Sequence, residues 1–571
     1  MPIKQTIVML LLAGPAAAQI AERNDVLIAE LMADPSPVVG LPNHEYIELK
    51  NGSSKTFNLS GWRIQDGSGV ATININFVLK PDGVVILCGS SAAGALRNFG
   101  EVIAVPSFPS LDNEGEQLGL YSPEGRLIFG LAYSSSWYRS GFKAAGGWSL
   151  EMIDENYPCG GVSNWAASRD NSGGSPGTKN SVAGTNVDAY APLAVRANAV
   201  DSLQIEVVFD EGMDSLSVVD VSMYEVSEGI GPPLNVAGIG VLLNAVRMRL
   251  RVPLQSGRIY EVLVRGVKDC EGNILKPFVT LRVGLAERAM AGDLVINEIL
   301  FNPPADGVDY VEINNRSRKV VDLRDCFIAG RSATGVVVNA RVLSIENRTV
   351  LPGGFLLLAS DTAWVCRRFR CRDPEVMVSV DLPAMGDEHG EILLLNGGGG
   401  LIDQLSYDEN WHFELLREKV GIALERLDIG APTQDRHNWQ SAATDAGWGT
   451  PGYKNSQQSR ELSTVEDGIV AEPKIFSPDG DGYDDYALFS YVLEEPGYTC
   501  NIILYDVSGM PVRHLVRNAL CGVRGFFRWD GLGEGGRVLP IGNYIAVIDL
   551  FTLQGKLKKI RKVLCLARKL G

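Results

Sequence analysis

Residues 26–64, VLIAELMADPSPVVGLPNHEYIELKNGSSKTFNLSGWRI, decide the fold of this chain because their pattern recurs. The stretch LVINEILFNPPADGVDYVEINNRSRKVVDLRDCFI, residues 294–328, repeats it in the same order. Each has an apolar segment with a central Glu, a Pro-containing turn, and a second apolar segment with a Glu. Short apolar runs bounded by Gly, Pro, Asn and Asp are typical of β-strands. The kept order and spacing indicate a duplicated unit.

The correspondence continues to the end of each copy. VLKPDGVVILCGS at 78–90 matches VLPGGFLLLASD at 350–361, and WSLEMID matches IALERLD. The closing NWAASRDNSGGSPGTKNS at 164–181 matches NWQSAATDAGWGTPGYKNS at 438–456. We therefore predict two copies of one all-β sandwich domain, at 24–182 and 291–456, with short helices near 92–99 and 362–369.

The paired Glu segments and the closing W…(S/T)PG-KN pattern resemble the bacterial lamin-tail domain. That resemblance implies an immunoglobulin-like sandwich of a kind found in exported bacterial proteins. The second copy departs from the pattern, since it reads DLRDCFI at 322–328 where the family has LSGW. Trp62 therefore has no counterpart, and Cys326 stands near its place. Any binding role of Trp62 is expected in the first copy alone.

Two further domains are predicted around the second copy. Residues 187–285 hold LQIEVVFDEGMD and RIYEVLVRGVKDCEGNIL, which resemble the bacterial Ig-like repeat and imply a spacer or interaction domain.

Residues 457–469 are polar and lack a strand pattern, so they are predicted to be a linker. Residues 470–571 hold YDVSG, WDG and LPIGNY in that order. They resemble the flagellar hook-cap-type Ig-like module and the C-terminal sorting domains of type IX secretion cargo. The fold class predicted is thus an all-β, multidomain string of Ig-like β-sandwiches.

Composition and the N-terminus limit the compartment and the partners. Residues 1–18 combine a basic start, an apolar stretch and small residues, as a signal peptide does, and no later run is apolar enough for a transmembrane segment. The net charge of −16 makes nucleic acid an unexpected partner. Of the nine cysteines, Cys366 with Cys371 is the best local pair for a disulfide, and Cys500 with Cys521 is a second. Because the number of cysteines is odd, at least one thiol has no partner for a disulfide within the chain.

The recurring glutamates and tryptophans are the first candidates for chemistry. Glu30 with Glu48 and Glu298 with Glu312 would form general acid and base pairs if each pair converged in a pocket. We favour strand residues that face solvent or cap a backbone edge, because no positioned nucleophile or His accompanies them. Trp165 and Trp439 would stack on a sugar ring if they were exposed. Packing inside the sandwich is the more usual role of such a Trp.

The acidic stretch SPDGDGYDD, residues 477–485, is the candidate metal site. Its carboxylates alternate with glycines, as in a loop that folds around Ca²⁺, and the ligands would be drawn from Asp479, Asp481, Asp484 and Asp485. It is not an EF-hand loop, because Tyr483 holds the fifth position and Ser490 the twelfth. An acidic turn without an ion fits the same residues.

These observations predict a secreted or cell-surface protein that is not an enzyme. Its expected role is extracellular binding, adhesion or scaffolding, with a protein or glycan partner. The resemblance at 470–571 adds secretion machinery as a partner and implies export through the outer membrane. Two alternatives stay open: a calcium-dependent or accessory hydrolase with an acidic site in one copy, and a structural surface-layer component.

Overall fold

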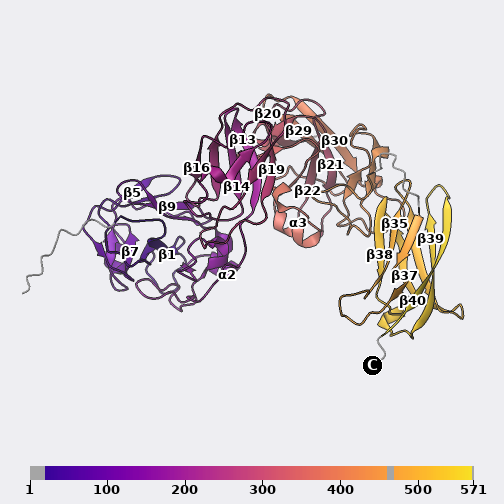
Figure 1. Ribbon diagram of the computed structural model, residues 1–571, viewed down its shortest axis with the longest axis horizontal. Helices are drawn as coiled ribbons and strands as arrows, with labels where there is room; N and C mark the ends of the chain where they lie inside the picture. The colour runs from indigo at the N-terminus through magenta and orange to yellow at the C-terminus, as the bar shows by residue number, and fades with distance from the viewer. Residues whose placement is uncertain (1–19, 333, 459–467, 569–571) are drawn as a thin grey trace, which may run out of the picture. The chain divides into compact units, whose positions relative to one another are not determined.

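The short apolar segments form strands throughout the chain, and Gly, Pro and Asn turns end them (Figure 1). The computed structural model describes residues 20–332, 334–458 and 468–568. The chain divides into two units: one runs to Pro253 and includes Tyr260–Val283, and the other holds Leu254–Ile259 and the residues from Gly284 onward. The predicted all-β class is confirmed. The expected signal peptide, 1–18, and most of the expected linker, 457–469, lie outside the described residues.

The first copy is built from two main sheets, which are antiparallel except that β7 and β8 run parallel. The larger sheet has, in order, β12 (Trp165–Ala167), β11 (Leu150–Met152), β1 (Val26–Met32), β2 (Tyr46–Asn51), β7 (Val84–Cys88) and β8 (Val102–Ala104). The smaller sheet has β10 (Leu127–Ala132), β9 (Gln117–Tyr121), β4 (Arg63–Gln65) and β5 (Val70–Thr72), and β3 (Phe57–Asn58) pairs with β6 (Val78–Leu79).

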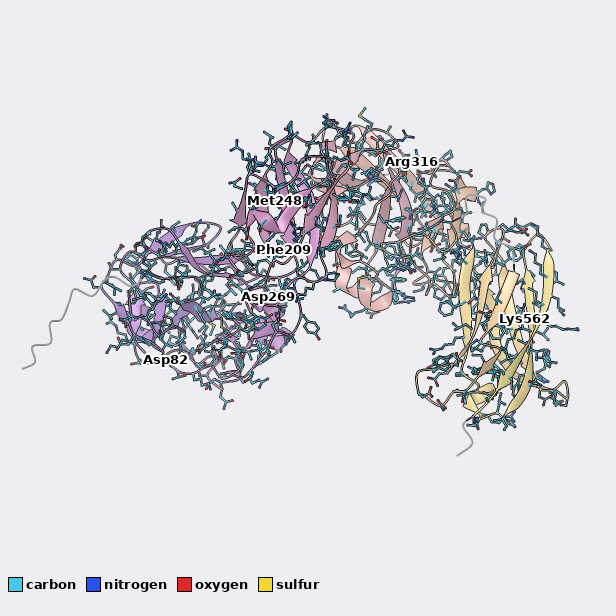
Figure 2. All side chains as sticks on the ribbon, viewed as in Figure 1. Asp82, Phe209, Met248, Asp269, Arg316 and Lys562 are labelled. Atoms are coloured by element: carbon cyan, nitrogen blue, oxygen red, sulfur yellow. A yellow bond between two sulfur atoms is a disulfide. The ribbon has the colours of Figure 1, made fainter. Side chains whose placement is uncertain are left out.

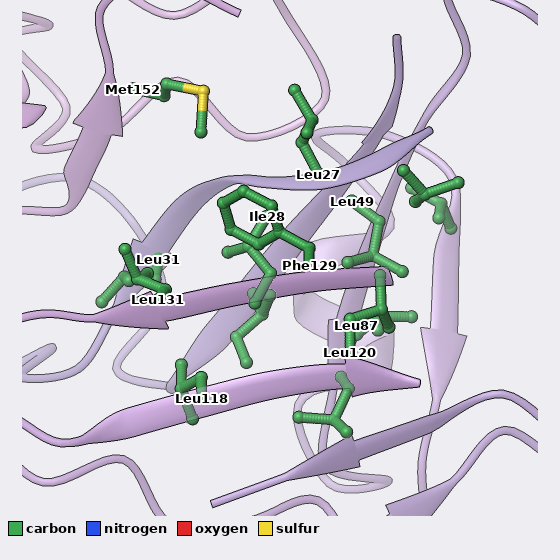
Figure 3. Packing of buried hydrophobic residues seen from close by; sticks show 14 of the residues in the cluster. Leu27, Ile28, Leu31, Leu49, Leu87, Leu118, Leu120, Phe129, Leu131 and Met152 are labelled. Carbon is green, nitrogen blue, oxygen red and sulfur yellow. The ribbon is translucent and has the colours of Figure 1, made fainter. Parts of the chain in front are cut away.

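The core of the first copy lies between these two sheets (Figure 3). Leu27 and Leu31 of β1 belong to this core together with Leu118 and Leu120 of β9, and each of the four is at least 99% buried. Burying one such side chain contributes about 1.5–3 kcal/mol. The outer face of the larger sheet is covered as well, by an apolar cluster around Leu96. Because both faces are buried, β1 reads as a continuous apolar run rather than an alternating one.

The second copy repeats this topology strand for strand. Its larger sheet has β28 (Met377–Ser379), β27 (Phe355–Ala359), β22 (Tyr310–Asn315), β21 (Leu294–Leu300), β31 (Leu424–Arg426) and β32 (Trp439–Ser441). The smaller sheet has β25 (Val337–Val342), β24 (Cys326–Arg331), β29 (His389–Asn396) and β30 (Leu401–Asp408). A third sheet joins β20 (Ala286–Glu287), β23 (Val320–Asp322) and β26 (Thr349–Val350). The duplication seen in the sequence is therefore a duplication of structure.

Cys326 takes the place of Trp62, as the sequence comparison suggests. The Ile73 N–H donates to the Trp62 carbonyl, and the Leu343 N–H donates to the Cys326 carbonyl in the same way, both at 2.9 Å. Trp62 is 97% buried, and its ring lies 5.8 Å from the ring of Phe57. Its role is therefore packing, and it is not displayed for a ligand.

Residues 187–285, which we call the spacer, form two small sheets packed around apolar side chains, among them Phe209 and Met248 (Figure 2). One sheet has β13 (Ala194–Asp201), β14 (Gln204–Phe209), β17 (Ala245–Arg249) and β16 (Asn235–Ile239). The other has β15 (Tyr224–Val226), β18 (Tyr260–Val264) and β19 (Val279–Val283).

The C-terminal module is a sandwich of a three-stranded and a five-stranded sheet around one core. The first has β33 (Gly468–Glu472), β35 (Ala487–Val492) and β38 (Arg524–Trp529). The second has β34 (Ile475–Phe476), β40 (Leu557–Leu566), β39 (Gly542–Phe551), β36 (Thr499–Tyr505) and β37 (Pro511–Leu520). The basic segment 557–566 is thus a strand, β40, that pairs with β39. The alternation of apolar and basic residues along this segment predicts a strand.

Helices are short, and two of the three α-helices in the described ranges occur where the sequence predicts them. They are α1 (Ala93–Leu96), α2 (Gly141–Ala144) and α3 (Thr362–Arg368). The 3-10 turns are η1 (Ser135–Tyr138), η2 (Gly161–Asn164), η3 (Val221–Met223), η4 (Leu323–Asp325), η5 (Pro374–Val376), η6 (Glu409–Trp411), η7 (Arg436–Asn438) and η8 (Glu534–Gly536). Among the described residues, no helix combines the length and the apolar character that a membrane span requires.

The cysteines follow the sequence expectation only in part. The Cys366–Cys371 disulfide is confirmed. The expected bridge between Cys500 and Cys521 is not formed: both are buried thiols, and the Cys521 thiol donates to the Ala519 carbonyl. A disulfide between Cys159 and Cys270, 111 residues apart, joins the first copy to the spacer. No sequence proximity points to that pair.

Candidate functional site

Strand register brings three glutamates together in each copy. In the first copy, Glu30 of β1 lies opposite Glu48 of β2 and opposite Glu151 of β11. The β1–β2 pairing shifts register between Ile28 and Glu30, as a β-bulge does. The second copy has the same arrangement around Glu298, as described below. We call each set a glutamate triad.

Glu30 and Glu48 hold a segment far away in the chain. Oε1 of Glu30 accepts hydrogen bonds from the Tyr46 hydroxyl at 2.6 Å and from the Ser175 N–H at 2.9 Å. Glu48 accepts the N–H of Gly177. Glu30 is fully buried and Glu48 is 99% buried. Both carboxylates therefore satisfy the backbone of the Ser-Pro-Gly turn.

Glu151 completes the attachment of this turn. Its Oε1 accepts the Ser175 hydroxyl at 2.8 Å, and its Oε2 accepts the Ser181 hydroxyl at 2.7 Å and the Val182 N–H at 3.1 Å. The Asn180 side-chain amide donates to carbonyls of both β1 and β11, each at 2.9 Å. Residues 175–182, which we call the closing loop, are thus fixed to three strands.

The second copy repeats these contacts. Glu298 accepts the Tyr310 hydroxyl at 2.5 Å, the Thr450 N–H at 2.9 Å and the Thr450 hydroxyl at 2.6 Å. Glu312 accepts the Gly452 N–H. Both glutamates are fully buried. The closing loop of this copy is residues 450–457.

Glu425 is the third member of the second triad. It accepts the Thr450 hydroxyl at 2.9 Å, the Ser456 hydroxyl at 2.8 Å and the Gln457 N–H at 2.8 Å. Asn455 donates to the carbonyls of Asn297 and Arg426, as Asn180 does to the matching strands. The recurring (S/T)PG-KNS motif is therefore the binding partner of the recurring glutamates.

The glycine of this motif is required by the backbone. Gly177 has a φ of 78° and Gly452 a φ of 83°, which is left-handed backbone that favours glycine. A Cβ on Gly177 would also collide with the Phe99 carbonyl. The tight turn lets the N–H of the glycine reach the carboxylate.

Burial dominates the titration of the triads. It is the largest cause that raises the pKa of Glu30 to about 7, and the charge of Glu151 is the next. It raises the pKa of Glu48 to about 8, helped by the charge of Glu30. In the second copy burial raises the pKa of Glu425 to about 8, followed by the charge of Glu298. Near neutral pH, these carboxyls hold part of their protons in the folded protein.

The triads do not have the geometry of an acid and base pair. Glu30 converges with Glu48, and Glu298 with Glu312, as a catalytic pair would, but the closing loop occupies their oxygens. The expectation that these residues face solvent is wrong, because the loop and the neighbouring side chains cover the outer face of the sheet. The backbone-capping expectation is confirmed.

Two members of the triads, Glu151 and Glu425, were not singled out from the sequence. The signal was present, because both stand at the same position of the matched segments WSLEMID and IALERLD. Trp165 and Trp439 are at least 96% buried, so the packing role is confirmed and sugar stacking is wrong. The Trp439 indole N–H donates to the Thr433 carbonyl at 2.8 Å.

The acidic stretch of the C-terminal module folds into a loop between β34 and β35. Carboxylate oxygens of Asp479, Asp481 and Asp485 lie within 4.8 Å of one another. The side chain of Asp485 accepts the N–H groups of Gly480 at 2.7 Å and Gly482 at 2.9 Å. The loop therefore gathers three of the four predicted ligands.

Asp484 is not part of this group. Its backbone has a φ of 51°, and its carbonyl accepts the Ser477 N–H at 2.9 Å, which closes the base of the loop. A second acidic group lies in the first unit, where Asp188, Glu211 and Asp269 come within the same 4.8 Å. Burial, with the charge of Asp188 next, raises the pKa of Glu211 to about 8. In the residues that the structure describes, the glutamate triads are not among the groups that bring metal ligands this close.

Fold and sites together define a string of β-sandwich modules, two of which carry a buried glutamate triad closed by an (S/T)PG-KNS loop. The model of the Lamin Tail Domain family matches residues 19–135, which include most of the first copy. No curated protein matches the chain.

Solved structures similar to the chain include a bacterial S-layer protein and two adhesion proteins. The N-terminal part of the bacterial S-layer protein SbsC is 14% identical over 38% of this chain and 44% of that chain, with a TM-score of 0.16. A tetra-tandem repeat from the extending region of a large adhesion protein is 10% identical over 93% and 97%, with a TM-score of 0.13. A Ca²⁺-stabilized adhesin with which an Antarctic bacterium binds ice is 8% identical over 96% and 100%, with a TM-score of 0.12. TM-scores this low support no statement on function.

Proposed function

We propose that this chain is an exported, non-catalytic surface protein whose β-sandwich modules act in extracellular binding or adhesion. One observation carries the proposal: all three carboxylates of each triad accept hydrogen bonds from a closing loop. General acid and base catalysis requires a carboxyl within reach of a substrate proton. A carboxylate that holds the backbone of its own chain acts in folding instead.

The duplication supports a structural role for the triads. Both copies keep the glutamates, the loop motif and the register, although they differ at Trp62 and Cys326. A catalytic site needs one pocket, whereas a fold element is needed in every copy. The exposed surfaces of the modules would then carry the binding function.

The experiment that tests this proposal uses the chain from residue 19 onward on arrays of extracellular proteins and glycans. Binding to an array ligand, without turnover of glycoside, peptide or phosphoester substrates, is the expected result. Turnover that is lost in Glu48→Gln or Glu312→Gln, with the fold kept, would establish the hydrolase alternative. Defined sheets or filaments in sizing and electron microscopy, without ligand binding, would establish the surface-layer alternative.

The C-terminal module supports an assignment to export, which rests on its sequence resemblance to sorting domains. We propose that residues 470–571 direct the chain to the cell surface. Deletion of these residues should leave the rest of the protein inside the cell envelope, measured by protease accessibility on whole cells. Surface display of the shortened chain at the level of the full chain would overturn the assignment.

Calcium is proposed as a structural ion of the loop at 477–485. Asp479, Asp481 and Asp485 offer the oxygen ligands that Ca²⁺ takes in proteins. An ion there would neutralise charge between β34 and β35 and stiffen the entry to the module.

A further inference from the structure

A cleft of about 1100 Å³ lies within the second unit, between the closing loop of the second copy and the three-stranded sheet of the C-terminal module. Hydrogen bonds fix its two walls to each other. The Thr444 N–H donates to the Leu520 carbonyl at 2.9 Å, and the Val523 N–H donates to the Ser456 carbonyl at 2.9 Å. The Gln457 side-chain amide donates to the Cys521 carbonyl at 3.2 Å. The cleft is thus a built feature of this unit.

The rim of the cleft is positively charged, although the chain as a whole has a net charge of −16. Five cationic residues line it: Arg370, Arg372, Lys454, Arg524 and Lys562. Figure 2 labels Lys562 on the C-terminal module. Within the described part of the chain, no salt bridge joins any of the five to a carboxylate.

Among the described residues that line the cleft, one is a carboxylate, and it is already engaged. Asp445 accepts the Tyr491 hydroxyl at 2.8 Å. Burial raises the pKa of Asp445. Five cations and one carboxylate give the described lining an excess of positive charge, which an anionic ligand complements.

The floor of the cleft is partly apolar. Val470, Ser490 and Phe526 lie in register across β33, β35 and β38. Val470 and Phe526 are each 52% exposed. The ring of Tyr453 lines the same cleft, with the guanidinium of Arg372 4.0 Å from its centroid. Aromatic and apolar side chains beside cations that form no salt bridge among the described residues suit a ligand that has both a flat hydrophobic face and acidic groups.

We propose that this cleft binds a short acidic saccharide, with uronate, sulfate or phosphate groups on the cationic rim and a sugar face on Phe526. The proposal rests on the proposed function in extracellular binding and names its ligand class. The cleft has the volume of a site for a few sugar rings. A long polyanion such as nucleic acid is repelled by the net charge of −16 that the whole chain carries.

Calorimetric titration of the chain from residue 19 onward with trigalacturonate tests the proposal, with neutral maltotriose as the matched ligand. The acidic trisaccharide should bind at least about tenfold more tightly, and added salt should weaken it. The Arg524→Gln, Lys562→Gln double variant should lose about tenfold in affinity or more, and Phe526→Ala should also weaken binding. These side chains are exposed or half-buried, so the fold should be kept; thermal melting checks it.

Arg561→Gln is the matched control. It removes one positive charge next to Lys562 on β40, but Arg561 does not line the cleft. It should bind trigalacturonate as the unaltered chain does. Equal binding of both trisaccharides, or full binding by the folded double variant, would overturn the proposal. So would an acidic peptide that binds more tightly than the saccharide and depends on the same cations.

Failure here is distinguishable from failure of the proposed function. A ligand found on the arrays whose binding survives the double variant would leave extracellular binding in place and remove the cleft as its site. The absence of any array ligand together with measurable turnover would remove both.

Discussion

Thr450 and Glu298 are joined by two hydrogen bonds across 152 residues of chain, one from the backbone N–H at 2.9 Å and one from the hydroxyl at 2.6 Å. The Thr450 hydroxyl also lies 2.9 Å from Glu425. One hydroxyl therefore lies between two buried carboxyl groups; it donates its single hydrogen to one of them and can accept from the other when that carboxyl is protonated. Ser175 has the matching contacts with Glu30 and Glu151 in the first copy.

Replacing the hydroxyl of Thr450 should destabilise the second copy. Thr450→Val keeps the shape and the N–H but removes the hydroxyl from between two buried carboxyl groups, which costs about 1.5–3 kcal/mol. Chemical denaturation should show this loss, and Thr450→Ser should recover most of it. Thr444→Val is the control, because the Thr444 hydroxyl is buried without a hydrogen-bond partner. Equal effects of the two valine variants would contradict the role of the triad.

The stability of both copies should fall as the pH rises from about 5 to about 8. The unfolded glutamates titrate near 4.5, whereas burial raises the pKa of Glu30 to about 7 and that of Glu48 to about 8. The folded state then binds more protons than the unfolded state, so stability is full below the unfolded pKa and is lost as the pH passes through the folded pKa. Each such site contributes a slope of about 1.4 kcal/mol per pH unit within its window.

Unfolding free energies measured at several pH values check this slope. Glu48→Gln should reduce the slope, since the amide oxygen still accepts the Gly177 N–H and no longer titrates. Glu101→Gln is the control, because Glu101 is exposed in the same copy. A stability that rises over this range would show that the triads are ionised in the folded protein and stabilised as such.

Loss of the Cys159–Cys270 disulfide should destabilise the first unit more than loss of Cys366–Cys371 destabilises the second. The two bridges close 111 and 5 residues. In the chain-entropy model the longer loop is worth about 4–5 kcal/mol and the shorter about 2 kcal/mol. Paired Cys→Ser variants and calorimetry of the whole chain measure both. A larger loss from the short bridge would contradict this order.

Calcium should raise the melting temperature of the C-terminal module. The ion would bind only the folded loop, so it stabilises by mass action. Asp481→Asn with Asp485→Asn should remove the response, because the loop then lacks two charges. Glu495→Gln is the control, since Glu495 pairs with Lys556 and is not in the acidic group. An unchanged melting temperature in excess Ca²⁺ would count against the ion.

The sequence predicted the all-β class and the duplication because strand patterns and repeats are local. The sequence also singled out Glu30 and Glu48 as candidate site residues, because the two glutamates recur in the second copy. Their burial depended on partners 145 and 129 residues away, and no local pattern reports such contacts. The same holds for Cys159 and Cys270. The grouping of Asp479, Asp481 and Asp485 could be predicted from the sequence, because a short loop brings neighbouring residues together.

The glutamate in the first strand of each copy needs hydrogen-bond donors from the closing loop at the end of that copy. A copy can therefore complete its fold only after its closing loop is available. Until the closing loop of a copy is available, three carboxyl groups lie side by side without their donors, and burying them is costly. A fragment of the first copy that ends at residue 135, where the family match ends, lacks both Glu151 and the loop. On the proposed export route, each copy would stay unfolded while it crosses a membrane. It acquires its native state only when its final residues have emerged.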